Sequence, residues 1–227
     1  MNKGSKRYNE TLTKFKTDEI FDLEKGVDVL KSIATAKFDE TVEVHIKLNL
    51  KKSHTVRDTV VLPNSFGKDK RILVFAKADK AKEALEAGAT YAGDSDYVAK
   101  VKEGWIDFDV VVATPDMMKE VGTLGPVLGR RGLMPNPKTG TITTDLKTAI
   151  GELKKGRVEF RADKTGIIHI GVGKMSMEPA KIKENIKALY EEVLRKRPSD
   201  LKGDYVGSFT ICPTMGPGVK INLKSVV

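Results

Sequence analysis

The sequence predicts a mixed α+β and α/β protein of two domains, in which a discontinuous α+β domain from both chain ends carries an inserted parallel α/β domain. Residues 41–50 alternate strictly between apolar and polar side chains, the pattern of a strand with one buried and one solvated face. From residue 72 to residue 155, short continuous apolar runs alternate with helical segments, which is typical of a parallel sheet covered by helices. The half-buried alternation then returns. The expected bounds are 1–67 with 157–227 for the outer domain, and 68–156 for the insert.

The first outer segment is expected to hold two helices and two strands. Residues 8–20 form a weak amphipathic pattern, and residues 23–34 form a stronger one that Asp22 is placed to cap. The alternating strand follows, and a second strand at residues 59–62 ends in a turn with Pro and Gly. The alternating strand needs sheet partners, and the best candidates lie after residue 156.

The insert is expected to alternate strands with helices, which predicts a parallel sheet with helices packed against it. Its expected strands are 72–76, 90–92 and 108–113, and its expected helices are 80–87, 94–102, one opened by Thr114 and Pro115, and 146–155. Gly88 stands where a left-handed residue ends the first of these helices.

The second outer segment is expected to begin with a hairpin. Its strands are residues 157–161 and 168–172, and residues 163–166 form the turn. A long helix over 178–197 follows, with Ser176 as its cap and Pro198 as its stop; the last two strands lie at 205–211 and 219–223. Because the chain crosses between the domains twice, near residues 67 and 156, we expect the domains to move relative to each other.

The composition favours a soluble globular protein and excludes several classes. The chain has 227 residues, of which 40% are hydrophobic and 31% charged. No apolar run approaches the roughly 20 residues of a membrane span, and no apolar segment follows the basic N-terminus, so neither a span nor a secretory signal is expected. The single Cys212 excludes an internal disulfide and a cysteine-rich zinc site, and we expect it to be a small core or edge residue.

The charge favours a polyanionic partner. The formal net charge is +9. The outer segments hold 25 Lys and Arg against 18 Asp and Glu, or +7, so the insert carries only +2. The outer domain is therefore the better candidate for contact with a nucleic acid.

Two short segments of the outer domain are candidates for such contact. Phe38 precedes the alternating strand, and it either stacks on a base or packs in the core. Thr214, Met215 and Gly216 lie between two strands; they form either an ordinary turn or a place where the backbone approaches a ligand closely.

The insert contains a conspicuous basic loop at residues 129–138. Arg130, Arg131 and Lys138 stand there among two Gly and two Pro, which predicts a stiff, exposed segment. We expect this loop to be a secondary basic surface for phosphate or a partner, and a merely solvated loop is the alternative.

The sequence contains no recognisable catalytic, metal or cofactor set. No Gly-x-Gly-x-x-Gly and no Walker-type loop follows the strand at 72–76. The three His lack metal-ligand spacing, and no Ser-His-Asp or Cys-His set can be assembled. We therefore expect no enzyme and no cofactor. A nucleotide-binding enzyme that uses the insert is the alternative, and a general DNA-binding protein is a third interpretation.

Four motifs occur in an order that resembles a known family. They are Lys37–Glu43, Gly132–Lys138, Asp163–Gly166 and Thr214–Gly216. Together they are similar to the bacterial-type ribosomal protein L-one family, whose members form the mobile stalk of the large ribosomal subunit. The resemblance covers nearly the whole chain. One departure is Arg130, which stands where the family commonly has Pro.

The resemblance implies a fold and a set of partners. The fold is an RNA-binding domain from both chain ends with an inserted Rossmann-like domain that holds no nucleotide. The implied function is to bind large-subunit rRNA, to help move deacylated tRNA out of the exit site, and to repress the own-operon mRNA through an rRNA-like site. The expected protein is cytoplasmic, on the ribosome, without membrane contact, and a monomer off the ribosome.

The resemblance also implies which residues contact RNA. One half of the expected surface lies at residues 37–41 and the other half at residues 214–216. The turn at 163–166 and two strand residues add further contacts. The residues are Lys37, Phe38, Glu40, Thr41, Lys164, Thr165, His169, Ser208, Thr214, Met215 and Gly216.

Overall fold

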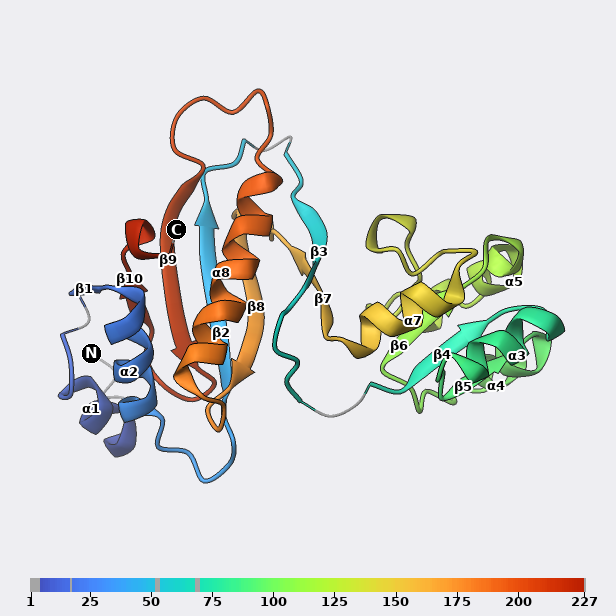
Figure 1. Cartoon of the computed structure of the whole chain (residues 1–227), viewed down its shortest axis with the longest axis horizontal. Helices are drawn as coiled ribbons and strands as arrows, with labels where there is room; N and C mark the ends of the chain where they lie inside the picture. Colours follow the sequence, from blue (N-terminus) through green and yellow to red (C-terminus); the bar gives the residue numbers. More distant parts are fainter. Residues whose placement is uncertain (1–4, 17, 52–53, 68–69, 227) are drawn as a thin grey trace. The chain divides into compact units, whose positions relative to one another are not determined.

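The chain divides into two compact units in the computed structural model, which describes residues 5–16, 18–51, 54–67 and 70–226 (Figure 1). Unit 1 comprises Met1–Gly67 and Val158–Val227, and unit 2 comprises Lys68–Arg157. Both parallel and antiparallel sheets are present, so the expected mixture of α and β structure is confirmed.

Unit 1 is built on a five-stranded sheet with the order β1-β10-β9-β2-β8. The strands are β1 (Ile20–Phe21), β2 (Thr41–Leu48), β8 (Ile167–Lys174), β9 (Val206–Pro213) and β10 (Val219–Ile221). The β1–β10 pair is parallel, and the other pairs are antiparallel. The alternating strand, β2, lies between β8 and β9, which confirms that its partners come from beyond residue 156.

One face of this sheet is covered by α2 (Leu23–Ile33) and α8 (Pro179–Arg195), which lie on the same side of it in Figure 1. The apolar side chains of β2 are buried in a core to which both helices contribute, because alternate strand residues point to one face. The polar residues of β2 point to the other face and are partly exposed.

Two local expectations for unit 1 are wrong, and a third is confirmed in position only. The first helix, α1 (Lys6–Leu12), ends well before residue 20, because Ile20 pairs with β10 instead. Glu178, not Ser176, is the N-cap residue of α8, because Ser176 is bonded to Asp39. Asp22 stands at the N-cap of α2, but its side chain makes no capping hydrogen bond.

The expected hairpin between residues 157 and 172 is also wrong. β7 (Arg157–Arg161) pairs with β3 (Arg57–Val61) in a separate two-stranded sheet, and Arg57 bonds to Glu159 across it. The turn itself is present: Asp163 N donates to Ile167 O at 2.9 Å, next to a single bridge between Ala162 and Ile168. Beyond that bridge β8 pairs with β2 and β7 pairs with β3, so β7 and β8 do not pair with each other as a hairpin.

Unit 2 contains a parallel three-stranded sheet with the order β5-β4-β6. Its strands are β4 (Ile72–Phe75), β5 (Tyr91–Gly93) and β6 (Val110–Ala113). Leu73 and Phe75 enter one core while Ile72 and Val74 enter another, so helices cover both faces, as the continuous apolar run predicts. The helices are α3 (Ala78–Glu86), α4 (Ser95–Lys102), α5 (Met118–Gly122), α6 (Gly125–Leu128) and α7 (Leu146–Lys154), with short 3-10 turns η1 (Pro115–Met117) and η2 (Pro137–Thr139).

Among the described residues, no helix combines the length and the apolar character that crossing a membrane requires.

Candidate nucleic-acid interface

The two predicted halves of the interface meet at one end of the five-stranded sheet. We call this the end surface and define it as Lys37, Phe38, Thr41, Thr214, Met215 and Gly216. Thr41 N donates to Thr214 Oγ1 at 2.9 Å, and Thr214 N donates to Thr41 O at 3.1 Å. The start of β2 is therefore hydrogen-bonded directly to the residues that follow β9.

The end surface exposes two large apolar side chains. Phe38 is 56% exposed and Met215 is 50% exposed. The alternative that Phe38 packs in the core is therefore wrong. An exposed aromatic ring and an exposed thioether, on segments that hydrogen bonds between Thr41 and Thr214 join, offer a surface on which a base or a ribose can pack.

Glu40, the remaining predicted residue of this segment, is buried, with 1% of its surface exposed. Its carboxyl oxygens accept from Ala36 N at 3.0 Å and from Met215 N at 2.9 Å. Glu40 therefore connects the two halves of the end surface through hydrogen bonds, and its buried carboxyl is not exposed to a ligand.

Two cationic side chains that the sequence did not single out border the end surface. Lys174 Nζ donates to Thr41 Oγ1 at 2.8 Å, and Arg7 donates to Met215 O at 2.8 Å. Lys174 is the register partner of Thr41 in the β2–β8 pair. Only the strand register could have revealed it, since the two residues are distant in sequence.

A row of polar residues continues along the sheet face opposite the helices. We call it the open face and define it as Glu43, His45, Lys47, His169, Ser208, Thr210 and Cys212. His45 stands between His169 and Thr210, and Lys47 stands beside Ser208. The predicted contacts His169 and Ser208 therefore lie on the same face, and both are exposed.

The turn between β7 and β8 lies at the far end of this face. Asp163 Oδ1 accepts from Thr165 N and from Ile167 N, each at 2.8 Å. The Ile167 amide and the Thr165 groups hold the pKa of this carboxyl below its usual value. Gly166 O accepts from Leu48 N at 2.8 Å, which ties the turn to the end of β2. Lys164 and Thr165 are thereby presented to solvent.

The centre of the open face is a short chain of polar contacts. His45 Nδ1 lies 2.8 Å from His169 Nδ1, and His45 Nε2 lies 3.0 Å from Cys212 Sγ. Burial lowers the pKa of His45, the nearby His169 lowers it further, and Glu43 opposes both. Burial, together with Glu43, raises the pKa of the Cys212 thiol to about 11.

The predicted secondary basic loop belongs to unit 2. Arg130 and Arg131 follow α6 and are exposed, and the chain turns at Gly132 with a φ of 70°. The side chain of Lys138 lies outside what the structure describes. In the same unit, the chain passes from β4 to α3 through Ala76 and Lys77 without a glycine, so this strand end lacks the usual backbone cradle for a phosphate.

Comparisons with known proteins identify similar chains. Residues 30–217 match the model of the ribosomal protein L1p/L10e family. The large ribosomal subunit protein uL1 of Treponema denticola is 59% identical over 222 residues, covering 98% of both chains. The proteins of the same name from Borreliella burgdorferi and Borrelia hermsii are 59% and 60% identical over 98% of this chain and 98% and 99% of their own.

Proposed function

The chain belongs to the ribosomal protein L1p/L10e family, and on that premise we propose that it binds large-subunit rRNA through the end surface, the open face and the β7–β8 turn. It is a structural protein of the large ribosomal subunit and therefore works on the ribosome in the cytoplasm. The family consists of structural proteins rather than enzymes, so the alternative of a nucleotide-binding enzyme is wrong.

The observation that carries the proposal is the hydrogen-bonded pair of Thr41 and Thr214, flanked in sequence by the exposed side chains of Phe38 and Met215. Hydroxyls and backbone groups held in place by hydrogen bonds suit recognition of ribose 2′-hydroxyls and unstacked bases. Lys37, Arg7 and Lys174 lie at these groups, and Lys164 lies at the far end of the open face. These cations supply the salt-dependent contact with phosphates. The contacts with bases, riboses and phosphates that these residues are given are part of this proposal.

The test is binding of the whole chain to a hairpin–internal loop fragment of large-subunit rRNA, measured by fluorescence anisotropy across a salt series. Unrelated structured RNA and duplex DNA serve as competitors. We expect wide discrimination between the RNAs and a log–log salt slope well short of the formal charge. Equal binding to all three nucleic acids, lost together as salt rises, would refute the proposal.

Met215→Asp tests the site itself. A carboxylate at this position would face RNA phosphates, so we expect the affinity for the rRNA fragment to fall by about tenfold or more. Leu85→Asp is the matched control, because Leu85 is 49% exposed, lies in unit 2 and changes the net charge equally. Thr214→Ala, which removes one hydroxyl, should weaken binding less. Similar affinities for Met215→Asp and Leu85→Asp would exclude the end surface.

We further propose that the same surface binds an rRNA-like site in the own-operon mRNA. Family resemblance supports this extension, and so does the economy of one surface for two similar RNA shapes. The mRNA site should compete with the rRNA fragment, and Met215→Asp should weaken both affinities in parallel. Simultaneous binding of both RNAs to one chain would contradict it.

A role in removing deacylated tRNA from the exit site is likewise proposed from the family resemblance. The exposed Arg130 and Arg131 of unit 2 are the cations that we assign to this contact. Ribosomes that carry Arg130→Gln with Arg131→Gln should release exit-site tRNA more slowly, while incorporation of the protein into the subunit stays unchanged. An unaltered release rate would remove the loop from this role.

A further inference from the structure

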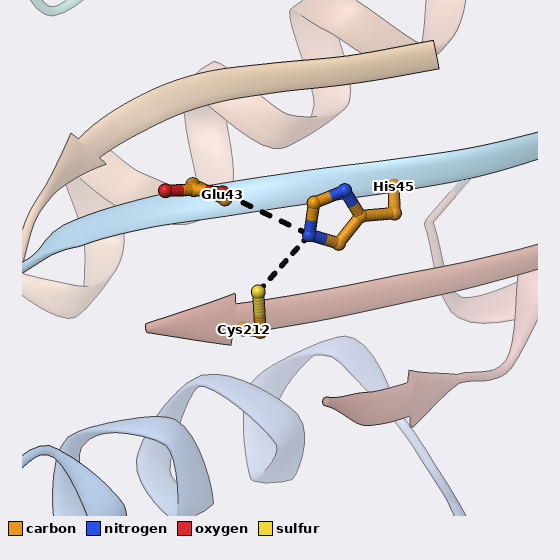
Figure 2. Close-up of side chains that lie close together, drawn as sticks. All are labelled: Glu43, His45 and Cys212. Carbon is orange, nitrogen blue, oxygen red and sulfur yellow. Dashed lines mark hydrogen bonds and ion pairs between the residues drawn. The ribbon is translucent and has the colours of Figure 1, made fainter. Parts of the chain in front are cut away.

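Three metal-ligand types meet at the centre of the open face (Figure 2). Glu43 and His45 are adjacent on the solvated side of β2, and Cys212 on β9 is the register partner of Glu43. His45 Nε2 lies 3.0 Å from Cys212 Sγ and 3.9 Å from Glu43 Oε2. The three donor atoms all lie within 4.8 Å of one another.

These separations are close to those of a tetrahedral zinc site. With the usual zinc bond lengths, a sulfur and a nitrogen ligand stand about 3.5 Å apart and a nitrogen and an oxygen ligand about 3.3 Å apart. The observed separations differ from these by about 0.5 Å, which small side-chain rotations can supply. The backbone positions are fixed by paired strands, so the cluster is built on rigid elements.

The ligand set also discriminates between metals. Thiolate and imidazole ligands select Zn²⁺ over Mg²⁺ and Ca²⁺, which prefer sites made wholly of oxygen. One sulfur, one nitrogen and one carboxylate oxygen leave a fourth position for water or for an exogenous ligand. The partial exposure of the three residues keeps that fourth position accessible.

His169 completes the arrangement from the neighbouring strand. A histidine that binds metal through Nε2 carries its proton on Nδ1, and that proton needs an acceptor. His45 Nδ1 lies 2.8 Å from His169 Nδ1, which can accept it. His169 then holds its own proton on Nε2, 3.8 Å from Asp163 Oδ2. This chain of contacts orients His45 with its free nitrogen toward Cys212 and Glu43.

We propose that Glu43, His45 and Cys212 form a binding site for a single Zn²⁺ ion, with His169 as a positioning residue. This site is defined by the geometry and chemistry of the three side chains alone, and it does not depend on RNA binding. Its test therefore uses the RNA-free protein, and the failure of one proposal leaves the other standing.

The first experiment replaces zinc by Co²⁺, whose thiolate complexes absorb in the near ultraviolet. The chain has one cysteine, so a sulfur-to-cobalt band can come only from Cys212. Full-length, reduced, metal-free protein should develop this band together with the visible bands of tetrahedral Co²⁺, at one ion per chain. Zn²⁺ should then abolish both. No band at saturating Co²⁺, or one ion shared by two chains, would overturn the proposal.

The second experiment measures Zn²⁺ affinity by competition with a chromogenic chelator. Cys212→Ser, His45→Gln and Glu43→Gln should each lower the affinity by more than about 100-fold, beyond the usual loss for an outer-shell change. His54→Gln is the matched control, because His54 bonds to Asp200 outside the cluster. Circular dichroism checks that each variant is folded. Wild-type affinity in His45→Gln or Glu43→Gln would refute the ligand assignment.

The third experiment separates positioning from ligation. His169→Asn should lower Zn²⁺ affinity by about 10–100-fold while the sulfur-to-cobalt band keeps its position. A band that shifts or disappears would make His169 a ligand, and an unchanged affinity would remove it from the site. Either result would overturn the positioning role.

Discussion

At the scale of single residues, one buried carboxyl group controls the geometry of the end surface. The Glu40 carboxylate accepts hydrogen bonds from the backbone N–H groups of Ala36 and Met215. It therefore connects the segment before β2 with the segment after β9. Both hydrogen bonds are partly buried, and an amide that loses its acceptor away from water destabilises a protein by about 1–3 kcal/mol. The position of Met215 therefore depends on a residue that never reaches the solvent.

Glu40→Ala leaves both amides without their acceptor. We expect the free energy of unfolding to fall by about 2–4 kcal/mol, measured by urea denaturation of the RNA-free protein. Lys37→Ala is the control, because this neighbour is exposed and surface substitutions change stability by about 0.5 kcal/mol or less. If Glu40→Ala and Lys37→Ala unfold at the same urea concentration, Glu40 does not have the assigned structural role.

The sequence could predict the members of the end surface but not the status of each. The family motifs identify Phe38 and Met215, but the strand pattern leaves open whether Phe38 is exposed or packs in the core, and the structure shows it exposed. The family resemblance places Glu40 among the RNA contacts, and no sequence pattern shows that its carboxyl is buried beneath Ala36 and Met215. The cluster of Glu43, His45 and Cys212 was missed because register alone joins residues that lie 167 positions apart.

At the scale of elements, the β7–β8 turn depends on Asp163. Its carboxylate accepts the Ile167 and Thr165 amides, and these contacts lower its pKa in the folded state. Because the folded pKa lies below the unfolded value of about 3.9, the stabilisation is complete above that pH and is lost as the pH falls through the folded pKa. The turn should therefore weaken in acid.

Asp163→Asn tests this pH dependence. We expect the difference in unfolding free energy between wild type and Asp163→Asn to be constant near neutral pH and to shrink below about pH 4. Urea denaturation at a series of pH values measures it. Lys164→Gln, a change at an exposed neighbour, should show no such convergence with the wild type. A difference that stays constant into acid would contradict the role of Asp163.

Strand patterns predicted most elements correctly but not the pairing of β7. Period-2 alternation located β2, β8 and β9, and continuous apolar runs located β4 and β6. Burial of one or of both faces of a strand determines which of its residues are apolar, so the sequence shows it directly. The sequence pattern says much less about which strand pairs with which. A Gly-ended turn between two strands suggests a hairpin, yet here β7 finds its partner in β3.

Helix α8 is attached to the sheet by a buried amide. Asn185 Nδ2 donates to Val172 O and to Asn64 O, each at 2.8 Å, and Oδ1 accepts from Asn64 N at 2.9 Å. Asn185→Leu removes all three bonds and leaves buried backbone groups unpaired, so we expect a loss of about 2–4 kcal/mol in unfolding free energy.

Lys187→Ala is the control for Asn185→Leu, because Lys187 is exposed on the same helix. Both variants are compared with the wild type by urea denaturation. A leucine that leaves stability unchanged would mean that its apolar burial offsets the lost bonds, and the attachment of α8 would then be hydrophobic alone.

At the scale of the whole molecule, the two units have separate cores. The core of unit 1 draws on both chain ends, from Leu23 to Val226, while the two cores of unit 2 use residues between Ile72 and Leu153. A unit with its own core can fold alone. With Arg157 counted in unit 2, unit 1 carries a net charge of +6 and unit 2 carries +3. The end surface also lies in unit 1, so binding of the rRNA fragment should belong to unit 1 alone.

A chain in which a short Gly-Ser linker replaces Lys68–Arg157 should therefore fold and bind the rRNA fragment within about tenfold of the full-length affinity, since the outer segments carry the phosphate contacts. The excised unit Lys68–Arg157 should also fold but show only weak, unselective binding. Circular dichroism and the anisotropy titration measure both. Loss of selective binding in a folded, linker-joined unit 1 would place part of the RNA contact in unit 2, and the exposed Arg130 and Arg131 would be its first candidates.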